Sequence, residues 1–432
     1  MKILVIDQDF CGLPFSMAAQ EDGHSVRLWN PHSTPIGDGI ISKVPTWQPH
    51  MKWADMIVLT DNSKTLWQLQ PYFDQHYPIF GSNKHAAQLE LDREMGQKAL
   101  EMCGIQTLPF EVFESFDKAI KYVEQKNRPF VCKPWGGDPD KSLSYVPKKP
   151  ADLLVRLERW KKDGKLKGKF MLQQMVTGVE MAVGGWIGPG GWAPWYNENW
   201  EEKRLMPDGL GPNTGEMGTV MRYTKDSRLF DLVLKPVAGL LMQLGYVGYV
   251  DMNCIIDEHG TPWPLEFTMR FGWPHFNLCM TLHEGDTAEW MLDLLHGKST
   301  LECSTDVCVG AVMAFPDFPY NKRPEEQSVG YPINGVLAKD SRSLRLSSVM
   351  RGPGIVASGT KRDTWLTAGT YVAIATGTGS TIERARKACY EQADRVTWAN
   401  DKIMRKDIGC RLEKTLPQLQ RQGFATGLKY GG

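Results

Sequence analysis

Two stretches decide the expected fold: GLGPNTGEMG at residues 209–218 and VGYVDMNCIIDEHGTPWPLEFTMRFG at residues 247–272. The second contains two apolar segments, 247–256 and 262–268, and the turn at 257–260 between them predicts a pair of neighbouring strands. The many glycines of the first stretch let a backbone approach a ligand closely. Such a loop is more often functional than not, and an ordinary surface loop is the structural alternative.

Polar side chains lie at alternating positions of the two predicted strands. Glu266, Thr268 and Arg270 are expected on one face, because residues two apart on a strand point the same way. Asp251 and Asn253 can join them from the partner strand. Carboxylate and amide oxygens that face nucleotide phosphates are what Mg²⁺ requires. A simple cross-strand salt bridge with Arg270 would explain this pattern about as well if the hairpin stood alone.

A second group of candidates follows an apolar strand expected at 129–133. Lys133 ends this strand, and Gly136, Gly137 and Lys141 follow in the turn after it. A glycine-rich turn with free N–H groups and lysines suits phosphate oxygens. The spacing differs from that of a Walker A loop, and a turn with a solvated lysine is the alternative interpretation.

Around these motifs the chain divides into three expected parts. Apolar strands alternate with helices up to about residue 85, which predicts a small parallel α/β domain. We expect one long helix over 84–103, another over 226–245, and a β-rich region from about 301 to 378. The expected strands of the first domain are 2–7, 25–29, 55–60 and 78–81. Near the C-terminus, RKDIG at 405–409 looks like a charged surface patch.

The composition is that of an ordinary globular protein. Of 432 residues, 42% are hydrophobic, and 50 Lys and Arg balance 50 Asp and Glu, which argues against a global nucleic-acid-binding surface. No apolar run approaches the roughly 18 residues that a bilayer-spanning helix needs. The start, MKILVID, reads as a buried strand rather than a signal peptide. Nine scattered cysteines without CxxC spacing are typical of reduced thiols, so we expect a cytoplasmic protein.

Taken together and in order, the motifs resemble phosphoribosylamine–glycine ligase, an ATP-grasp family. The matching segments are HAAQLE at 85–90, GIQT at 104–107, FVCK at 130–133, KR at 203–204, GLGPNTGEMG at 209–218, IIDEHGTPWPLEF at 255–267, RFG at 270–272 and RKDIG at 405–409. The resemblance runs from end to end. It implies an α/β and α+β multidomain protein: an N-terminal parallel α/β (pre-ATP-grasp) domain at 1–84, an ATP-grasp core at 85–300 with a lid at about 108–175, and a C-terminal β-rich domain at 301–432.

The resemblance also implies ATP and Mg²⁺, with Mn²⁺ as an alternative metal, and an amide bond formed through an acyl phosphate. The implied ATP-binding residues are Lys133, Gly136, Gly137, Lys141, Gln173, Gln174 and Glu180. The implied metal site is Glu266, with Thr268, Asp251 and Asn253 around it. Lys203 and Arg270 would steady the transferred phosphoryl group, and Asn213 and Thr214 would line the substrate side. The partners would be small molecules, glycine or another amino acid and an amine acceptor, with the chain acting as a monomer.

Departures from the family pattern gather on the acceptor side. DQDFCG at 7–12 stands where the family has a Gly-rich turn followed by Arg-Glu-His, and TDNS at 60–63 replaces a Gly-Pro-Glu type loop. Both loops serve phosphoribosylamine in the family, and Asp7 and Asp9 would repel a phosphate. WPH at 273–275 replaces the Asp-Pro-Glu that follows RFG.

Other departures touch the nucleotide side. Thr268 stands where an Asn is expected two residues after the metal carboxylate, and the turn after Lys133 lacks the usual Ala-Gly-Lys-Gly string. The lysine expected after HAAQLE has only Gln97 or Lys98 near its place. Three interpretations stay open: a diverged phosphoribosylamine–glycine ligase, the same chemistry with another amine acceptor such as a modified nucleotide or base, and a catalytically silent nucleotide-binding protein.

Overall fold

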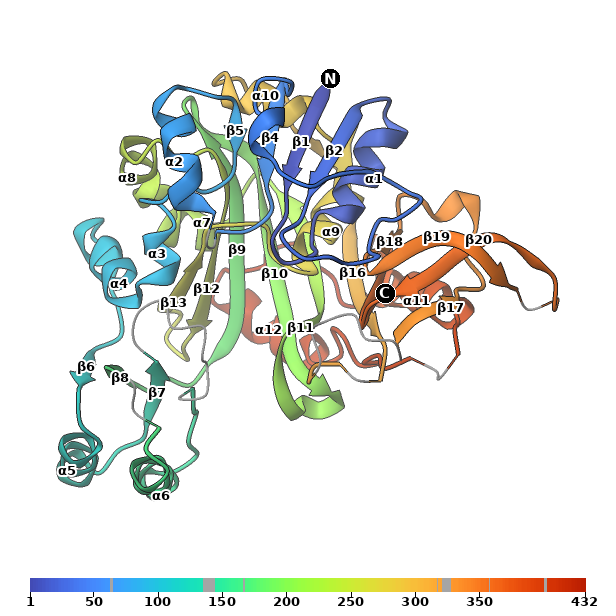
Figure 1. Cartoon of the computed structure of the whole chain (residues 1–432). Helices are drawn as coiled ribbons and strands as arrows, with labels where there is room; N and C mark the ends of the chain where they lie inside the picture. Colours follow the sequence, from blue (N-terminus) through green and yellow to red (C-terminus); the bar gives the residue numbers. More distant parts are fainter. Residues whose placement is uncertain are drawn as a thin grey trace.

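The N-terminal part is a five-stranded parallel sheet of order β3-β2-β1-β4-β5 (Figure 1). The computed structural model describes residues 1–62, 65–134, 144–165, 168–316, 318–320, 328–356, 358–399 and 402–432. Apolar strands alternate with helices here, as expected. Its elements are β1 (Lys2–Ile6), α1 (Leu13–Glu21), β2 (Ser25–Trp29), β3 (Ser42–Val44), β4 (Met56–Leu59), α2 (Leu66–Asp74) and β5 (Ile79–Phe80).

A small unit with its own core follows two short helices, α3 (Gln88–Leu91) and α4 (Arg93–Met102). Its three-stranded sheet has the order β6-β8-β7 and carries two helices on one side. The unit consists of β6 (Phe110–Phe113), α5 (Phe116–Lys126), β7 (Phe130–Pro134), α6 (Pro150–Lys162) and β8 (Phe170–Gln174). Phe116, Trp160 and Phe170 pack at its centre, separately from the main core, and Figure 1 shows the unit projecting from the rest of the molecule.

An eight-stranded sheet, β13-β12-β9-β10-β11-β16-β21-β18, forms the body of the protein. Its first five strands are β9 (Val179–Gly188), β10 (Gly191–Met206), β11 (Leu210–Thr224), β12 (Gly248–Ile256) and β13 (Pro262–Thr268), and the last three are β16 (Val307–Ala314), β18 (Leu344–Leu346) and β21 (Tyr371–Gly379). Strands from the C-terminal third therefore complete the sheet of the central region. The division of the chain at residues 84 and 300 stays a prediction.

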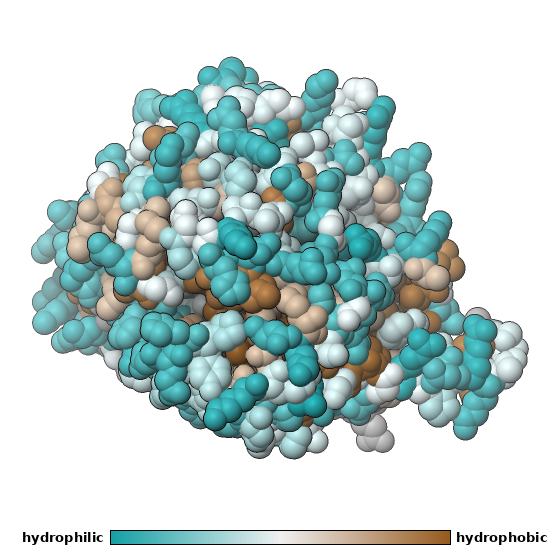
Figure 2. Space-filling model, turned by 90° about the horizontal axis from the view of Figure 1, so that it is seen from above, coloured by the Kyte–Doolittle hydropathy of each residue, from teal (hydrophilic) through white to brown (hydrophobic). Residues whose placement is uncertain are grey.

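Helices and a smaller sheet surround this body. The helices are α7 (Arg228–Val233), α8 (Ala238–Gln243), α9 (His275–Leu282), α10 (Glu289–Leu295), α11 (Ile382–Arg395) and α12 (Leu412–Arg421). A three-stranded sheet of order β17-β20-β19 lies at one side, built from β17 (Val329–Pro332), β19 (Val349–Ile355) and β20 (Lys361–Ala368), and β14 (His283–Glu284) pairs with β15 (Glu302–Cys303). Seen from above, hydrophilic side chains cover most of the surface, with apolar ones gathered near its middle (Figure 2). None of the helices described is long and apolar enough to cross a membrane.

Four local expectations were wrong. The helix expected at 84–103 is two helices, because Asp92 leaves the helical conformation and caps α4 through the N–H groups of Glu94 and Met95. The helix expected at 226–245 is broken into α7, a 3₁₀ turn (Lys235–Val237) and α8, where Pro236 supplies no backbone N–H.

The other two errors concern the glycine-rich stretch and the C-terminal motif. Residues 207–218 form the tip and one arm of the hairpin β10–β11, not a loop, because the tight turn Pro207–Gly209 lets the strands pair directly. Arg405, at the start of the RKDIG motif, is buried rather than part of a surface patch. It contacts Asp407 and Glu202, and these two carboxylates compensate the charge of the buried guanidinium.

Candidate active site

Lys133 lies at the end of β7, where the small unit faces the body of the protein. Its Nζ donates to Gln173 Oε1 at 2.8 Å, from the neighbouring strand β8. Loss of hydration and repulsion from Arg93 lower the pKa of Lys133 to about 8, with Glu266 acting in the opposite direction. An ammonium group that is partly stripped of water gains most from an anionic ligand, so this position suits a phosphate.

Glu266 lies on β13 directly across the ladder from Asn253 on β12, and Thr268 lies across from Asp251. The expected cross-strand grouping is therefore confirmed. Arg93, the first residue of α4, reaches Glu266 with a separation of 3.1 Å between its NH2 and Oε2. Arg93 is thus a cation shortly after HAAQLE that contacts Glu266, whereas a lysine was expected near Gln97 or Lys98.

Lys203 on β10 adds a second ammonium group to the same face. Its Nζ lies 2.9 Å from Glu201 Oε2, which also accepts a hydrogen bond from Asn253 Nδ2 at 3.0 Å. Loss of hydration opposes its charge, but Glu201, Glu266 and Glu180 together raise the pKa of Lys203 above its usual range. The lysine is thus held fully charged beside the carboxylates of β10 and β13.

Asp251 is buried one position further along β12. Its Oδ2 accepts hydrogen bonds from Asn199 Nδ2 at 2.9 Å and from the Tyr249 hydroxyl at 3.0 Å. Burial raises its pKa to about 7, with a further contribution from Glu201 and in spite of the two hydrogen bonds. The Tyr249 hydroxyl also contacts His275 Nε2 at the start of α9. Burial lowers the pKa of His275 to about 4, so its imidazole is neutral at pH 7.

The donor set around Glu266 fits a divalent cation that is shared with phosphates. Asn253 Oδ1 is buried and has no hydrogen-bond partner among the residues described, although it lies opposite Glu266. No group of three or more His, Cys, Asp or Glu side chains capable of holding a metal occurs in the described ranges. Mg²⁺ typically takes only one or two protein carboxylates and fills its remaining positions with phosphate oxygens and water. Glu266 and Asn253 match that pattern.

Arg270 links this face to the N-terminal domain. Its guanidinium lies 3.0 Å from Glu90 Oε1, and Glu90 Oε2 accepts hydrogen bonds from Asn62 Nδ2 at 2.8 Å and from the Met269 N–H at 2.7 Å. Glu90 raises the pKa of Arg270. A single carboxylate from the HAAQLE motif therefore fixes both Arg270 and a loop at the edge of the parallel sheet.

The remaining expected residues are placed less centrally. Thr214 Oγ1 donates to the Lys203 carbonyl at 2.9 Å, and exposed Asn213 lies across the hairpin from Arg204. Glu180 on β9 lies 3.6 Å from Arg411 NH1. Gln174 lies beside Gln173 on β8, but alternation along the strand turns it to the opposite face. Gly136, Gly137 and Lys141 lie outside the residues that the structure describes.

A separate pocket opens at the C-terminal ends of β1 and β2, lined by Asp7, Phe10, Asn30, His32 and Lys43 among others. Asp7 fills the position where an anion would bind. Its Oδ1 accepts from the Cys11 N–H and the Thr60 hydroxyl at 2.9 Å each, and its Oδ2 accepts from the Gly12 N–H at 2.9 Å. Burial raises the pKa of Asp7 to about 6 even though these donors oppose the shift. Lys43 is already paired, at 2.6 Å from Asp38.

Three of the groups that organise the site were missed or undervalued from sequence. Arg93 and Glu201 bind the expected residues Glu266 and Lys203, and Asn199 holds Asp251. Alternation along β10 puts positions 199, 201 and 203 on one face, and that spacing was readable once 199–206 was taken as a strand. Arg93 carried no comparable signal, because its partner lies 173 positions away.

Comparisons with known proteins agree with this geometry. No family model matches the chain. A curated relative named phosphoribosylamine–glycine ligase, from Lactococcus lactis, is 26% identical over 353 residues, which cover 77% of this chain and 78% of the relative. A crystal structure of phosphoribosylamine–glycine ligase from Thermotoga maritima superposes with a TM-score of 0.72 at 20% identity, covering 95% of this chain and 100% of the other.

More distant structures share the same architecture. The biotin carboxylase domain of the 2-oxoglutarate carboxylase from Hydrogenobacter thermophilus, in complex with ADP and magnesium, has a TM-score of 0.63 at 11% identity, with 93% of this chain and 91% of the other covered. These likenesses confirm the expected fold class. The chain has the ATP-grasp fold and is related in sequence to the phosphoribosylamine–glycine ligases, as its motifs led us to expect.

Proposed function

We propose that this protein is an ATP-dependent ligase that joins the carboxyl group of glycine, or of another amino acid, to an amine. The observation that carries the proposal is the convergence of Lys133, Lys203, Arg93 and Glu266 from separate elements onto one face. The site combines three cationic side chains with the carboxylates of Glu266 and Glu201 and the amide oxygen of Asn253. The names of the sequence relatives, all ligases that form a C–N bond, support the same reaction class.

The chemistry explains why such a site is needed. A carboxylate is a poor electrophile, and phosphorylation converts its oxygen into a leaving group. Phosphoryl transfer requires mainly positioning and neutralisation of charge. In our proposal Lys133 binds phosphate oxygens of ATP, and Lys203 and Arg270 hold the transferred group and the acyl phosphate in place.

Glu266 and Asn253 Oδ1 would hold the metal. Thr268 and Asp251, the next facing pair on the same two strands, would support them. Bound Mg²⁺ supplies neutralisation of the phosphate charge, and Mn²⁺ fits the same oxygen ligands. Gln173 accepts a hydrogen bond from Lys133, Glu180 is proposed to contact the nucleoside, and Gln174 would contribute only through its backbone. Thr214 supports the backbone of Lys203, and Asn213 would face the substrate from the hairpin.

A second candidate, with an acceptor other than phosphoribosylamine, is favoured by one observation. The carboxylate of Asp7 accepts hydrogen bonds from the Cys11 and Gly12 N–H groups after β1 and from the Thr60 hydroxyl after β4, and these donors could otherwise bind a phosphate. The start of a helix after a parallel strand is the usual anion site of α/β folds. The aromatic ring of Phe10 and the side chains of Asn30 and His32 would instead contact a base or another group without a phosphate.

The deciding experiment measures ADP release together with product mass. The mixture contains the protein, Mg-ATP, glycine, and phosphoribosylamine formed in situ from ribose 5-phosphate and ammonia. A glycinamide ribonucleotide peak supports the first candidate. Glycine-dependent ADP release without that product supports an acyl phosphate with a different acceptor. Absence of ADP release with any amino acid would leave the third interpretation, a catalytically silent nucleotide-binding protein.

We further propose a monomer that acts in the cytoplasm, with the N-terminal domain, the core with its lid, and the C-terminal region as successive parts of one catalytic unit. Side chains of a single chain contribute every group that the proposal uses. Nine free cysteines, of which six are buried, support a reducing compartment. A sedimentation measurement with and without Mg-ATP tests the monomer, and a stable dimer would overturn it.

A further inference from the structure

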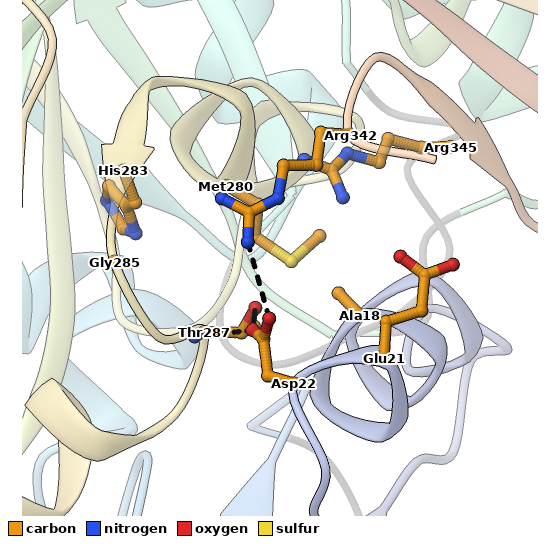
Figure 3. A pocket seen from close by; sticks show the side chains of 9 residues that line it. All are labelled: Ala18, Glu21, Asp22, Met280, His283, Gly285, Thr287, Arg342 and Arg345. Atoms are coloured by element: carbon orange, nitrogen blue, oxygen red, sulfur yellow. Dashed lines mark hydrogen bonds and ion pairs between the residues drawn. The ribbon is translucent and has the colours of Figure 1, made fainter. Parts of the chain in front are cut away.

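A pocket separate from the candidate active site lies between the end of α1, the end of α9 and the segment 342–345 (Figure 3). It is a hollow that opens to solvent, and its lining combines the apolar side chains of Ala18 and Met280 with charged ones. His275, which contacts Tyr249 in the candidate active site, begins α9, whereas Met280 and His283 at the far end of that helix line this pocket. Nothing in the proposed ligase chemistry uses it.

Arg345 is the unusual residue of this pocket. It is only 3% exposed, and its side chain has one hydrogen bond within the described ranges, a long one of 3.4 Å from NH2 to the Thr281 hydroxyl. Its Nε is buried without a partner, and no carboxylate among the described residues lies within ion-pair distance. Burial lowers its pKa to about 10, so the guanidinium stays charged at pH 7. The carboxylates of Glu21 and Asp22 favour the charged form of Arg345, but neither forms an ion pair with it among the described residues. A buried charge without a direct partner is costly, so this position favours an anionic group beside the guanidinium.

The other charged side chains of the lining have partners, with the exception of Glu21. Asp22 accepts hydrogen bonds from the Thr287 N–H at 2.9 Å and hydroxyl at 2.5 Å, and it pairs with Arg342 at 3.3 Å. Burial and the nearby Arg345 lower the pKa of His283 to about 3, so this imidazole is neutral. Glu21, at the end of α1, is exposed and makes no ion pair with any residue that the structure describes. Figure 3 shows its carboxylate and the Arg345 guanidinium facing the same space from below and above.

Among the described residues, the pocket therefore has a cation without an ion pair at its inner wall, Arg345, and an anion without an ion pair at its rim, Glu21. A phosphate would meet Arg345 but would be repelled by Glu21 and Asp22. A simple carboxylate would leave Glu21 without a partner. We propose that this pocket binds the zwitterion of a free amino acid, with its carboxylate on Arg345 and its ammonium group on Glu21. A ligand held in this way would connect α1 of the N-terminal domain to the segment 342–345.

Calorimetric titration of the full-length protein without nucleotide tests the proposal. The probes are glycine, L-alanine and L-glutamate as zwitterions, with acetate, methylammonium and inorganic phosphate as partial matches. We expect saturable binding of at least one amino acid, and binding of acetate and methylammonium at least tenfold weaker. Arg345→Gln and Glu21→Gln should each weaken amino-acid binding at least tenfold. Because Glu21 is exposed, Glu21→Gln should fold normally. It therefore still tests the proposal if Arg345→Gln fails to fold.

Matched controls separate this site from the active site, where an amino acid is the proposed substrate. Glu258→Gln removes a carboxylate that is 85% exposed on a distant turn, and Arg351→Gln removes an exposed arginine paired with Asp363. Both should bind as the unmodified protein does. Glu21→Gln should keep the KM for the ligated amino acid unchanged while losing the binding event. Equal binding by Glu21→Gln and the unmodified protein, phosphate binding tighter than that of any amino acid, or no binding at all would overturn the proposal.

Discussion

Lys133 sits close to its titration point at physiological pH because it is partly stripped of water and faces Arg93 and Lys203. Its pKa of about 8 lies below that of a free lysine, so the ammonium group is fully present below pH 7 and is lost as the pH rises past 8. We predict that the KM for ATP rises between pH 7.5 and 9.5. Steady-state kinetics across that range, at saturating amino acid, measure the effect.

The control is Lys133→Arg, whose guanidinium does not titrate in this range. Its KM for ATP should be higher at pH 7 but flat up to pH 9.5. If the unmodified enzyme also shows a flat profile, Lys133 does not contact the phosphates.

Glu266 can be removed without unfolding the protein, because its side chain is 40% exposed. We predict that Glu266→Ala loses at least 100-fold in ATP turnover, since one carboxylate carries much of the metal affinity. The midpoint of urea unfolding should stay nearly constant. Glu258→Ala, which removes an exposed carboxylate of the same hairpin, serves as the control. Unaltered turnover and Mg²⁺ dependence in Glu266→Ala would exclude it as the metal ligand.

At this scale the residues proposed to carry the chemistry were easier to predict than the residues that contact them. Lys133, Lys203, Glu266 and Arg270 stand in recognisable motifs, and the first three lie close enough to shift one another's pKa values. The residues that contact them could not be predicted, because an ion pair such as Arg93 with Glu266 joins residues that are far apart in sequence and leaves no local pattern. Asp7 was expected to repel a phosphate, but its internal hydrogen bonds to the following turn could be seen only in three dimensions.

Among the elements, α4 connects local sequence to the site most directly. Asp92 caps this helix, and the next residue, Arg93, pairs with Glu266. We predict that Asp92→Ala costs about 1 kcal/mol of folding free energy and raises the KM for ATP, because fraying of the first turn moves Arg93. Chemical denaturation and ATP kinetics measure the two effects. Ser115→Ala removes another N-cap residue whose hydroxyl makes no capping bond, and it should change neither quantity much.

The turn between β1 and α1 gives a second prediction at this scale. Removing the Asp7 side chain frees the Cys11 and Gly12 N–H groups and the Thr60 hydroxyl. We expect Asp7→Ala to gain binding of ribose 5-phosphate that the unmodified protein lacks, at a cost of about 1–3 kcal/mol in stability from the lost hydrogen bonds. Calorimetry measures the gain. Asp9→Ala, in the same turn, should not show it. Tight binding of ribose 5-phosphate by the unmodified protein would contradict the role given to Asp7.

Most strands and helices with a strong pattern of apolar residues could be predicted, but the breaks within them could not. The strands at 25–29 and 247–256 were expected nearly as found. The expected helix over 84–103 is interrupted at Asp92. The residues on both sides favour helix, but the Asp92 side chain caps a new helix and so breaks the first one. The glycine-rich stretch at 209–218 was taken for a loop, since glycine weakens the strand signal even where a long hairpin forms.

For the whole molecule, sequence indicated the class of fold but not how distant strands meet. Hairpin neighbours such as β12 and β13 follow from proximity along the chain. The pairing of β11 with β16, and of β16 with β21, joins segments separated by roughly 60–90 residues, and nothing local specifies it. The end-to-end resemblance supplied this information, because a family pattern implies an arrangement that single elements do not.

Arg405 shows how the C-terminal end holds the site together. It is 2% exposed, bonds to Asp407 at 2.7 and 2.8 Å, donates to the Arg204 carbonyl and lies 3.2 Å from Glu202 on β10, next to Lys203. Removing one partner of a buried charge group leaves the other uncompensated, which typically costs about 3–5 kcal/mol. We therefore predict that Arg405→Ala lowers the urea midpoint strongly and also reduces turnover, because the strand that carries Lys203 loses its anchor.

The neighbouring Lys406→Ala tests whether this effect comes from burial rather than from charge alone. Lys406 is 70% exposed and pairs with Asp394 at 3.3 Å, so its removal should change stability by no more than about 0.5 kcal/mol. Arg405→Lys keeps the charge but loses the bidentate contact with Asp407. Its loss of stability should lie between those of Lys406→Ala and Arg405→Ala. If Arg405→Ala matched Lys406→Ala, the buried contacts with Glu202 and Asp407 would add nothing to stability, and the motif would be the surface patch that its sequence suggested.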